Sequence, residues 1–120
     1  MAAKDVLGRA GEDRAVAHLH KRGWCVLDRN WRCAGGELDV VALDGGELVV
    51  VEVKTRSGMG FGHPLEAVDA RKRARLWRLA IAWAAAHPDA ARGRDIRLDA
   101  IAVIGADPAT ARVEHVVDLR

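Results

Sequence analysis

Glu52 and Lys54 stand out because they lie within an otherwise apolar run, LVVVEVKTR at residues 48–56. Charged side chains are rarely fully buried unless they are paired. Side chains alternate between the two faces of a strand, so Glu52 and Lys54 point to one face and Val53 points to the other. An acid and a base two residues apart indicate that this face meets other charged groups.

A hairpin is expected to bring a second acid to these two residues. Within residues 37–56, the runs ELDVVALD and ELVVVEVKTR flank a Gly-Gly pair, which is a strong hairpin signal. If the two glycines form a two-residue turn, Asp39 lies opposite Glu52 and Glu37 lies opposite Lys54. A turn one residue earlier shifts the pairing by two and makes Asp39 a diagonal neighbour of Glu52 on the same face. Both registers gather two carboxylates and one ammonium group.

Two opposed carboxylates need a partner. At a separation of about 5 Å they repel by roughly 3 kcal/mol at an effective dielectric of about 20. Lys54 offsets part of this repulsion, and a divalent cation offsets more, since Mg²⁺ is typically held by one or two carboxylates with phosphate oxygens and water. The alternative is a cross-strand ion-pair network, in which Glu37 pairs with Lys54 while Asp39 and Glu52 face solvent.

Glu12 supplies a third acid from a helix expected over residues 5–22. It lies in the middle of an apolar stripe with helical spacing, formed by Ala15, Val16 and Leu19. A carboxylate that faces the core usually has a partner or a cation, which favours a metal site. A second, weaker apolar face would leave Glu12 at a boundary instead; it consists of Val6, Ala10 and Ala17.

The remaining segments predict one α/β domain over residues 1–120. A second helix is expected over residues 65–86, ended by His87-Pro88, and WRCAGG at 31–36 is expected to be a loop. The expected strands are 24–30, 37–44, 47–56, 95–104 and 112–119. The order α-β-β-β-α-β-β indicates a three-layer fold with a mixed central sheet of about five strands. Asp99 in the fourth strand is expected to support Arg97 or the end of the sheet.

The acids and their flanking segments resemble a known group of nucleases. Asp39, Glu52-Val53-Lys54 and Glu12 are arranged as in the PD-(D/E)xK superfamily. The flanks are similar, in the same order and over nearly the whole chain, to the small bacterial YraN-type family: GRAGEDRAVAHL, GWCVLDRNWR, GGELDVVALD, LVVVEVKTR, GHPLEAVDARKRARL and RLDAIAV. That family is classed with restriction-endonuclease-like folds and is closest in arrangement to archaeal Holliday-junction resolvases. The resemblance implies a restriction-endonuclease-like fold.

The resemblance also implies a role for each acid and for the lysine. Asp39 and Glu52 would ligate Mg²⁺ or Mn²⁺, with the carbonyl of Val53 as a further ligand. Glu12 would complete the metal shell directly or through water. Lys54 would orient or deprotonate the attacking water, or stabilise the pentacovalent phosphate. A metal held by carboxylates suits phosphodiester hydrolysis, because it activates water and neutralises charge on the phosphoryl oxygens.

Two neighbours of Asp39 complete this comparison. Glu37 belongs to the family-like segment GELD and is expected to support Lys54 from a second layer. Leu38 precedes Asp39, so the Pro-Asp of the superfamily's name is absent here, as it often is within the superfamily.

A basic run, RKRARLWR at residues 71–78, lies on the second helix. Its arginines form either a solvated helix face or a surface that contacts phosphates. Lys72 falls within the apolar stripe of that helix, so it either extends its charge to solvent or points toward the acidic patch as an auxiliary cation. The residues expected to contact nucleic acid are Arg56, Arg71, Lys72, Arg75 and Arg78.

Composition limits the class of protein further. The 120 residues carry a net charge of +2, and 50% are apolar and 30% charged, which is typical of a globular domain. No apolar run approaches the roughly 20 residues of a membrane span, and no signal peptide is recognisable, so a cytoplasmic location is expected. Cys25 and Cys33 are too few for a disulfide framework or a zinc finger and are expected to be free thiols.

We therefore expect a nucleic-acid-binding, Mg²⁺- or Mn²⁺-dependent endonuclease that hydrolyses DNA phosphodiesters, with structured or branched DNA favoured by analogy. RNA stays open as a substrate. A homodimer is one expected assembly, because resolvase-like proteins make two cuts with two sites. Two other functions stay open: a nucleic-acid-binding module that lacks turnover or needs a partner, and a structural domain with a cross-strand salt-bridge network.

Overall fold

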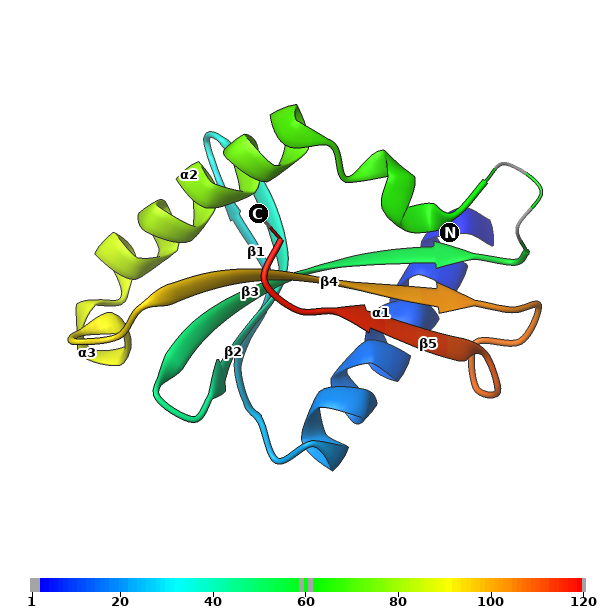
Figure 1. Cartoon of the computed structure of the whole chain (residues 1–120), viewed down its shortest axis with the longest axis horizontal. Coiled ribbons are helices and arrows are strands. Elements are labelled where there is room, and N and C mark those ends of the chain that lie inside the picture. The colour runs from blue at the N-terminus through cyan, green and yellow to red at the C-terminus, as the bar shows by residue number, and fades with distance from the viewer. Residues whose placement is uncertain (1–2, 59, 61, 120) are drawn as a thin grey trace.

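A five-stranded mixed sheet lies between helices in a three-layer α/β fold (Figure 1). The computed structural model describes residues 3–58, 60 and 62–119. The strands are β1 (Cys25–Cys33), β2 (Gly36–Asp44), β3 (Glu47–Arg56), β4 (Ile96–Ile104) and β5 (Arg112–Val116). The helices are α1 (Ala3–Lys21), α2 (Ala70–Ala86) and the short α3 (Pro88–Ala91), with a 3₁₀ turn, η1, at Pro64–Ala67.

The strands lie side by side in chain order, β1-β2-β3-β4-β5. Only β3 and β4 are parallel, because η1, α2 and α3 lie between them in the chain, whereas the other neighbouring pairs are antiparallel. The expected fold class and element order are confirmed.

The β2–β3 hairpin has the two-residue turn that the Gly-Gly pair predicts. Asp44 pairs with Glu47, and the ladder continues to Val40 and Val51. Gly45 has a φ of 59°, a left-handed conformation that glycine adopts at little cost. Beyond this ladder the two strands no longer pair residue by residue, which leaves Asp39 at the point where they separate.

The two faces of the sheet bury two separate apolar clusters. The β3 residues Val49, Val51 and Val53 pack in the cluster that contains α1 residues. Leu48 and Val50 pack in the cluster that contains α2 residues. Strand alternation therefore puts Glu52 and Lys54 on the α2 face of the sheet.

Helix α1 packs through the stripe that contains Glu12. Ala15, Val16 and Leu19 are buried in the core, while Val6 is 54% exposed and Ala17 is exposed. The alternative packing through the Val6 and Ala17 face is therefore wrong.

Three expected boundaries are wrong. The strand expected over 112–119 ends earlier, because β5 spans only Arg112–Val116. The helix expected over 65–86 is interrupted: η1 is separate, and α2 begins at Ala70 because the Asp69 side chain caps it, accepting a 2.9 Å hydrogen bond from the Lys72 N–H. The expected loop at 31–36 is reduced to a two-residue turn, because β1 continues to Cys33 and pairs with Gly36 of β2.

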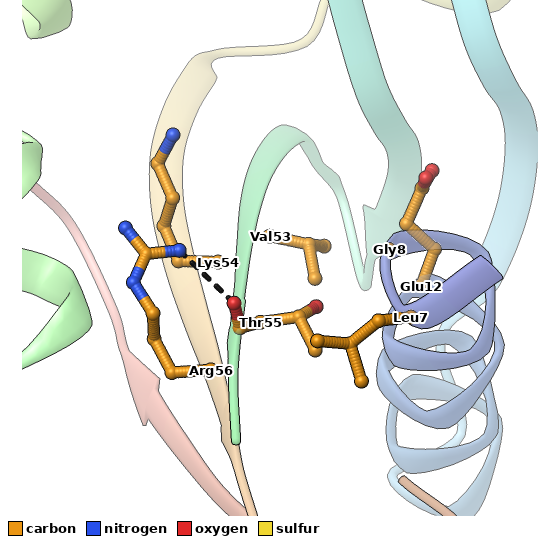
Figure 2. A pocket seen from close by; sticks show the side chains of 7 residues that line it. All are labelled: Leu7, Gly8, Glu12, Val53, Lys54, Thr55 and Arg56. Carbon is orange, nitrogen blue, oxygen red and sulfur yellow. Dashed lines mark hydrogen bonds between the residues drawn. The ribbon is translucent and has the colours of Figure 1, made fainter. Parts of the chain in front are cut away.

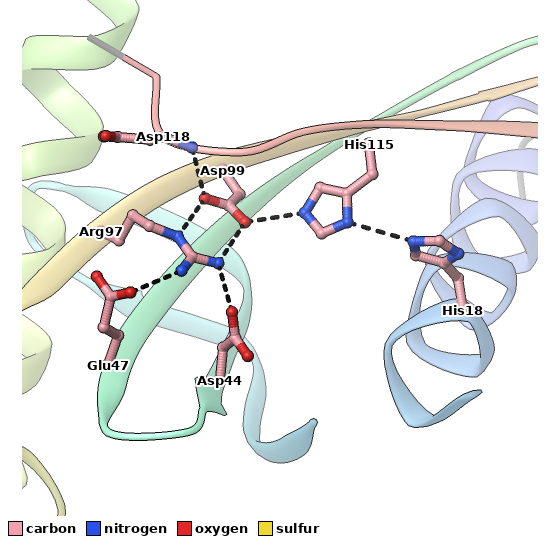
Figure 3. Close-up of polar contacts among 7 residues, drawn as sticks. All are labelled: His18, Asp44, Glu47, Arg97, Asp99, His115 and Asp118. Carbon is pink, nitrogen blue, oxygen red and sulfur yellow. Dashed lines mark hydrogen bonds and ion pairs between the residues drawn. The ribbon is translucent and has the colours of Figure 1, made fainter. Parts of the chain in front are cut away.

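A buried ion-pair network ties β4 to its neighbours (Figure 3). Asp99 is 0% exposed and accepts hydrogen bonds from Arg97 Nε at 2.9 Å and His115 Nε2 at 2.8 Å. Arg97 also pairs with Asp44 at 3.0 Å and Glu47 at 2.9 Å, the residues that flank the β2–β3 turn. Asp99 thus supports Arg97, and the network joins the turn, β4 and β5.

Within the described ranges 3–58, 60 and 62–119, none of the helices combines the length and apolar character needed to cross a membrane. Cys25 and Cys33 are free cysteines, as expected.

Candidate functional site

Asp39 lies in the gap where β2 leaves β3. Its Oδ2 accepts a 2.9 Å hydrogen bond from the Val53 N–H, so a side chain replaces the backbone acceptor that a continued ladder would supply. The N–H and C=O of a strand residue point to the same side, so the Val53 carbonyl also faces this gap. A carboxylate and a backbone carbonyl, both hard oxygen donors, therefore share one opening in the sheet.

Asp39 is surrounded by other acids. Burial raises the pKa of Asp39 to about 7, and the charge of Glu52 adds to the rise. Glu12 and Glu37 act in the same direction, while the Val53 N–H opposes the shift. Within the described residues no Lys, Arg or His side chain forms an ion pair with Asp39, so its charge has no cationic partner there.

Glu52 is buried at 6% exposure but has two cations beside it. Its Oε1 lies 3.4 Å from Lys54 Nζ and 3.6 Å from Lys72 Nζ. Lys72 reaches Glu52 from α2, so of the two expected orientations its side chain takes the one toward the acidic patch. The predicted partnership between Glu37 and Lys54 is wrong: Lys54 contacts Glu52 instead.

Glu37 turns toward β1. Its Oε2 lies 3.3 Å from Arg32 Nε, because β1 extends alongside β2 where a loop was expected. The amide of Asn30, oriented to satisfy both acids, donates to Glu37 Oε1 at 3.2 Å and to Glu12 Oε1 at 2.7 Å. Asn30 thereby links the helix acid to the strand acid.

Asn30 is a site residue that the sequence interpretation missed. It has a φ of 53°, a left-handed conformation that Asn adopts more readily than most residues. Asn is also depleted in strands. An Asn within an expected strand was the one sequence signal that could have identified it.

The Glu12 carboxylate approaches from α1. Burial raises its pKa above the ordinary value, and although Arg29 opposes the rise, the charge of Glu37 adds to it. Figure 2 shows Glu12 on the same side of β3 as Val53, whereas Lys54 extends from the opposite side. The adjacent pocket of about 260 Å³ is lined by Leu7, Gly8, Glu12, Val53, Lys54, Thr55 and Arg56.

Acids from both faces of the sheet therefore act on Asp39 through the gap beside it. Glu52 belongs to the α2 face and Glu12 to the α1 face, yet the charge of each raises the pKa of Asp39. Across residues 3–58, 60 and 62–119, no three His, Cys, Asp or Glu side chains are already arranged to hold a metal ion. The donor types fit a hard divalent cation, and side chains would have to move to close a shell around it.

The residues expected to contact nucleic acid fall into separate groups. Lys72 is held at Glu52, and Arg56 donates from Nη1 to the Thr55 carbonyl at 3.0 Å beside the pocket. Arg75 lies against Gly36 at the β1–β2 turn. Arg71 and Arg78 are exposed on α2 and do not line the pocket beside Glu12.

Gly11 controls how closely α1, and therefore Glu12, approaches β3. A Cβ at Gly11 would lie 2.0 Å from Thr55 Oγ1 and 2.9 Å from Thr55 Cβ. We expect Gly11→Ala to push the helix away and to lower the free energy of unfolding by about 1–3 kcal/mol in urea titrations.

Gly8→Ala is the matched control, because a Cβ there meets nothing within 4 Å. Removing a helical glycine without a clash should raise stability by up to about 1 kcal/mol. Equal stability of Gly11→Ala and the wild type would show that Gly11 does not set this contact.

A family profile and individual related proteins point to the same family. The profile described as "Uncharacterised protein family UPF0102" matches residues 11–103, a span that includes Glu12, Asp39, Glu52 and Lys54. A UPF0102 protein of Arthrobacter sp. (strain FB24) is 50% identical over 115 residues, covering 96% of each chain. One from Beutenbergia cavernae is 53% identical over 115 residues, also 96% of each chain. One from Frankia alni is 52% identical, covering 96% of this chain and 94% of the relative.

Proposed function

This chain belongs to the uncharacterised protein family UPF0102, the YraN-type family that its motifs resemble, and we propose that it is a nucleic-acid-binding hydrolase. It cleaves the phosphodiester bonds of DNA internally, with Mg²⁺ or Mn²⁺ as the cofactor.

The environment of Asp39 is the observation that carries the proposal. A carboxylate bound by one backbone N–H, with a pKa of about 7 and acids as its charged neighbours, is costly in a purely structural role. Salt-bridge networks alternate charges, as the Arg97–Asp99 network does. A divalent cation would supply the charge that Asp39 lacks, so the arrangement favours a metal site over the cross-strand network.

The groups that would hold the metal are Asp39, Glu52, the Val53 carbonyl and, directly or through water, Glu12. Oxygen donors of this kind suit Mg²⁺ and Mn²⁺, and neither Cys nor His is among them. A bound metal would supply charge neutralisation on the phosphoryl oxygens and a water of lowered pKa.

Lys54 is the residue we assign to the reacting phosphate. Its ammonium group lies 3.4 Å from Glu52, and its side chain is 24% exposed, so it keeps hydrogen-bond donors available toward the opening. It holds the attacking water or a phosphoryl oxygen as a mobile point charge. Lys72 offsets part of the charge of Glu52 and frees Lys54 for this contact.

The substrate class follows from charge and from analogy. We place DNA first, with branched or structured forms favoured, and RNA second. Paired cuts in a branched substrate would need two sites and hence a homodimer. We place the protein in the cytoplasm, where free thiols such as Cys25 and Cys33 stay reduced.

The second candidate is a binding module without turnover, or one that needs a partner for it. It is favoured by the absence of a closed metal-binding cluster among the described residues. Such a protein would bind nucleic acid with steep salt dependence and leave it intact.

The proposed function is tested by incubating the purified protein with end-labelled branched, flapped and single-stranded DNA and matching RNA. With Mg²⁺ or Mn²⁺ we expect internal cuts in the wild type, and with EDTA we expect none. Lys54→Met should lower the cleavage rate by at least about 10²-fold. Methionine keeps much of the aliphatic volume, so the loss reports the charge.

Lys21→Met is the matched control, because Lys21 is exposed at the far end of α1. It should cut as fast as the wild type. Cleavage that persists in Lys54→Met would mean a contaminating nuclease or a wrong assignment, and binding without cleavage in any condition would support the second candidate.

A further inference from the structure

Two clefts on the β1 side of the molecule share a wall. The larger, of about 930 Å³, lies between α1 and β1 and contains Asp39, Arg9 and Arg32 among its lining residues. The smaller, of about 410 Å³, lies between the β1–β2 turn and α2 and contains Arg32 and Arg75. Arg32 and Glu37 line both clefts, so the two form one path that starts at the candidate site.

Arg32 is placed to bind an anion along this path. Its side chain is 79% exposed, and its one ion pair joins Nε to Glu37 at 3.3 Å. No hydrogen bond or ion pair is found for its two terminal nitrogens among the described residues. The forked donors of Arg32 therefore point into a wide cleft with capacity to bind an oxyanion.

Arg75 reaches the same path from α2. Its guanidinium rests on the β1–β2 turn, where a Cβ at Gly36 would come within 2.6 Å of Nη2. Gly36 has a φ of 139°, so it meets both the conformation and the space that this contact needs. Within the part of the chain that the structure describes, Arg75 forms no ion pair with an acid.

The acids of the path are unevenly distributed. The part next to α1 is lined by Glu12, Asp13 and Asp39 and also by Arg9 and Arg29, of which Arg29 is paired with Asp13 at 2.7 Å. The part next to the turn is lined by Glu37, which is already paired with Arg32. The turn end is therefore cationic and the Asp39 end is acidic. A ligand with several linked phosphates matches both ends, with one phosphate at the metal-binding acids and the next ones at the arginines.

We propose that a nucleic-acid strand follows this joined cleft and that Arg32 and Arg75 bind the phosphates adjacent to the one that is cut. The inference rests on the proposed function and deepens it, since it assigns the substrate's path. It also divides the arginines of α2: Arg75 lines the path and contacts the strand, whereas Arg71 and Arg78 line neither cleft and do not contact it.

The test is binding of a fluorescent DNA strand, followed by anisotropy in EDTA over a range of salt concentrations. For the double variant Arg32→Ala/Arg75→Ala we expect the Kd to rise about 10-fold or more and the slope of log Kd against log salt to fall by about 1–2. Both side chains are exposed, so melting temperatures should stay close to that of the wild type.

Two variants serve as comparisons. Arg71→Ala/Arg78→Ala removes the same charge from two residues of α2 that line neither cleft. Arg92→Ala removes an 81% exposed arginine at the end of α3. Both should bind within about twofold of the wild type, apart from a small change due to net charge.

The outcomes separate this inference from the proposed function. If the wild type binds or cuts DNA but Arg32→Ala/Arg75→Ala does not weaken binding, the path is wrong and the proposed function stands. An equal or larger loss in Arg71→Ala/Arg78→Ala would also overturn the path, because arginines outside the joined cleft would then contribute as much. A wild type that neither binds nor cuts nucleic acid would overturn both.

Discussion

Replacing Asp39 with Asn should stabilise the protein at pH 8. The folded-state pKa of Asp39 is about 7, above the ordinary value of 3.8, because of burial and the charge of Glu52. Keeping this carboxylate ionised therefore costs folding free energy at high pH. Asn is neutral and still offers an oxygen to the Val53 N–H, so it removes the cost without leaving that donor unpaired.

The stability difference between Asp39→Asn and the wild type should depend on pH. Because the pKa of Asp39 is higher in the folded than in the unfolded protein, its bound proton stabilises the fold. This stabilisation is fully present below about pH 4 and is lost as the pH rises through about 7. One pKa unit corresponds to about 1.4 kcal/mol, so the gap between Asp39→Asn and wild type should grow from near zero at pH 4 to on the order of 2–4 kcal/mol at pH 8. Urea titrations without metal at both pH values measure it.

The control is Asp89→Asn, since the Asp89 side chain is 100% exposed. It should change stability by no more than about 0.5 kcal/mol at either pH. If Asp39→Asn instead destabilises the protein at pH 8, Asp39 belongs to a favourable ion-pair network and the structural alternative gains.

Asp99→Ala should destabilise the protein, in contrast to Asp39→Asn, and it should have the largest effect on stability of these variants. It removes the acceptor for Arg97 and His115 in a site with 0% exposure, and also the acceptor of the Asp118 N–H at 2.9 Å. Breaking one partner of a buried pair typically costs about 3–5 kcal/mol. Urea titrations should show a loss of this size, a large part of the roughly 5–15 kcal/mol of a small domain.

Glu47→Ala tests whether the loss comes from burial. Glu47 pairs with the same arginine but is 48% exposed, so its removal should cost about 1 kcal/mol or less. Although burial alone would raise the pKa of Asp99, the hydrogen bonds from His115 and Arg97 outweigh it and lower the pKa. The advantage of the wild type over Asp99→Ala should accordingly shrink as the pH falls and Asp99 protonates. Equal costs for the two variants would contradict the buried-network interpretation.

Local patterns were enough to predict the hairpin and its acids. The Gly-Gly turn sets the β2–β3 register, and strand alternation then places Glu52 and Lys54 on one face. The same alternation relates Arg97 to Asp99 two residues later. These predictions succeeded because each depends on neighbours in the chain and on a strand period of two.

Contacts made by distant segments were not predictable in the same way. Glu37 was predicted to pair with Lys54 because the ladder was assumed to continue beyond Val40. The strands β2 and β3 separate there, and Arg32 of β1, which is longer than expected, forms the ion pair with Glu37 instead. His115 joins Asp99 from β5, a contact that no spacing in the sequence indicates.

The start of α2 was missed for a local reason. Asp69 has the side chain of an N-cap, yet the apolar spacing from Leu65 and Val68 into the helix suggested one continuous element. Apolar periodicity does not distinguish a 3₁₀ turn followed by a helix from one longer helix, because both present the same face to the core.

The central claim is that Asp39 and its neighbouring acids hold a divalent cation, and Mn²⁺-dependent melting tests it most directly. At about 100 times its Kd, Mn²⁺ should stabilise the wild type by about 2.7 kcal/mol and raise its melting temperature, more at pH 8 than at pH 6 because Asp39 must lose its proton. Asp39→Asn should show no such rise. An unchanged wild type, or an equal rise in Asp39→Asn, would contradict the claim.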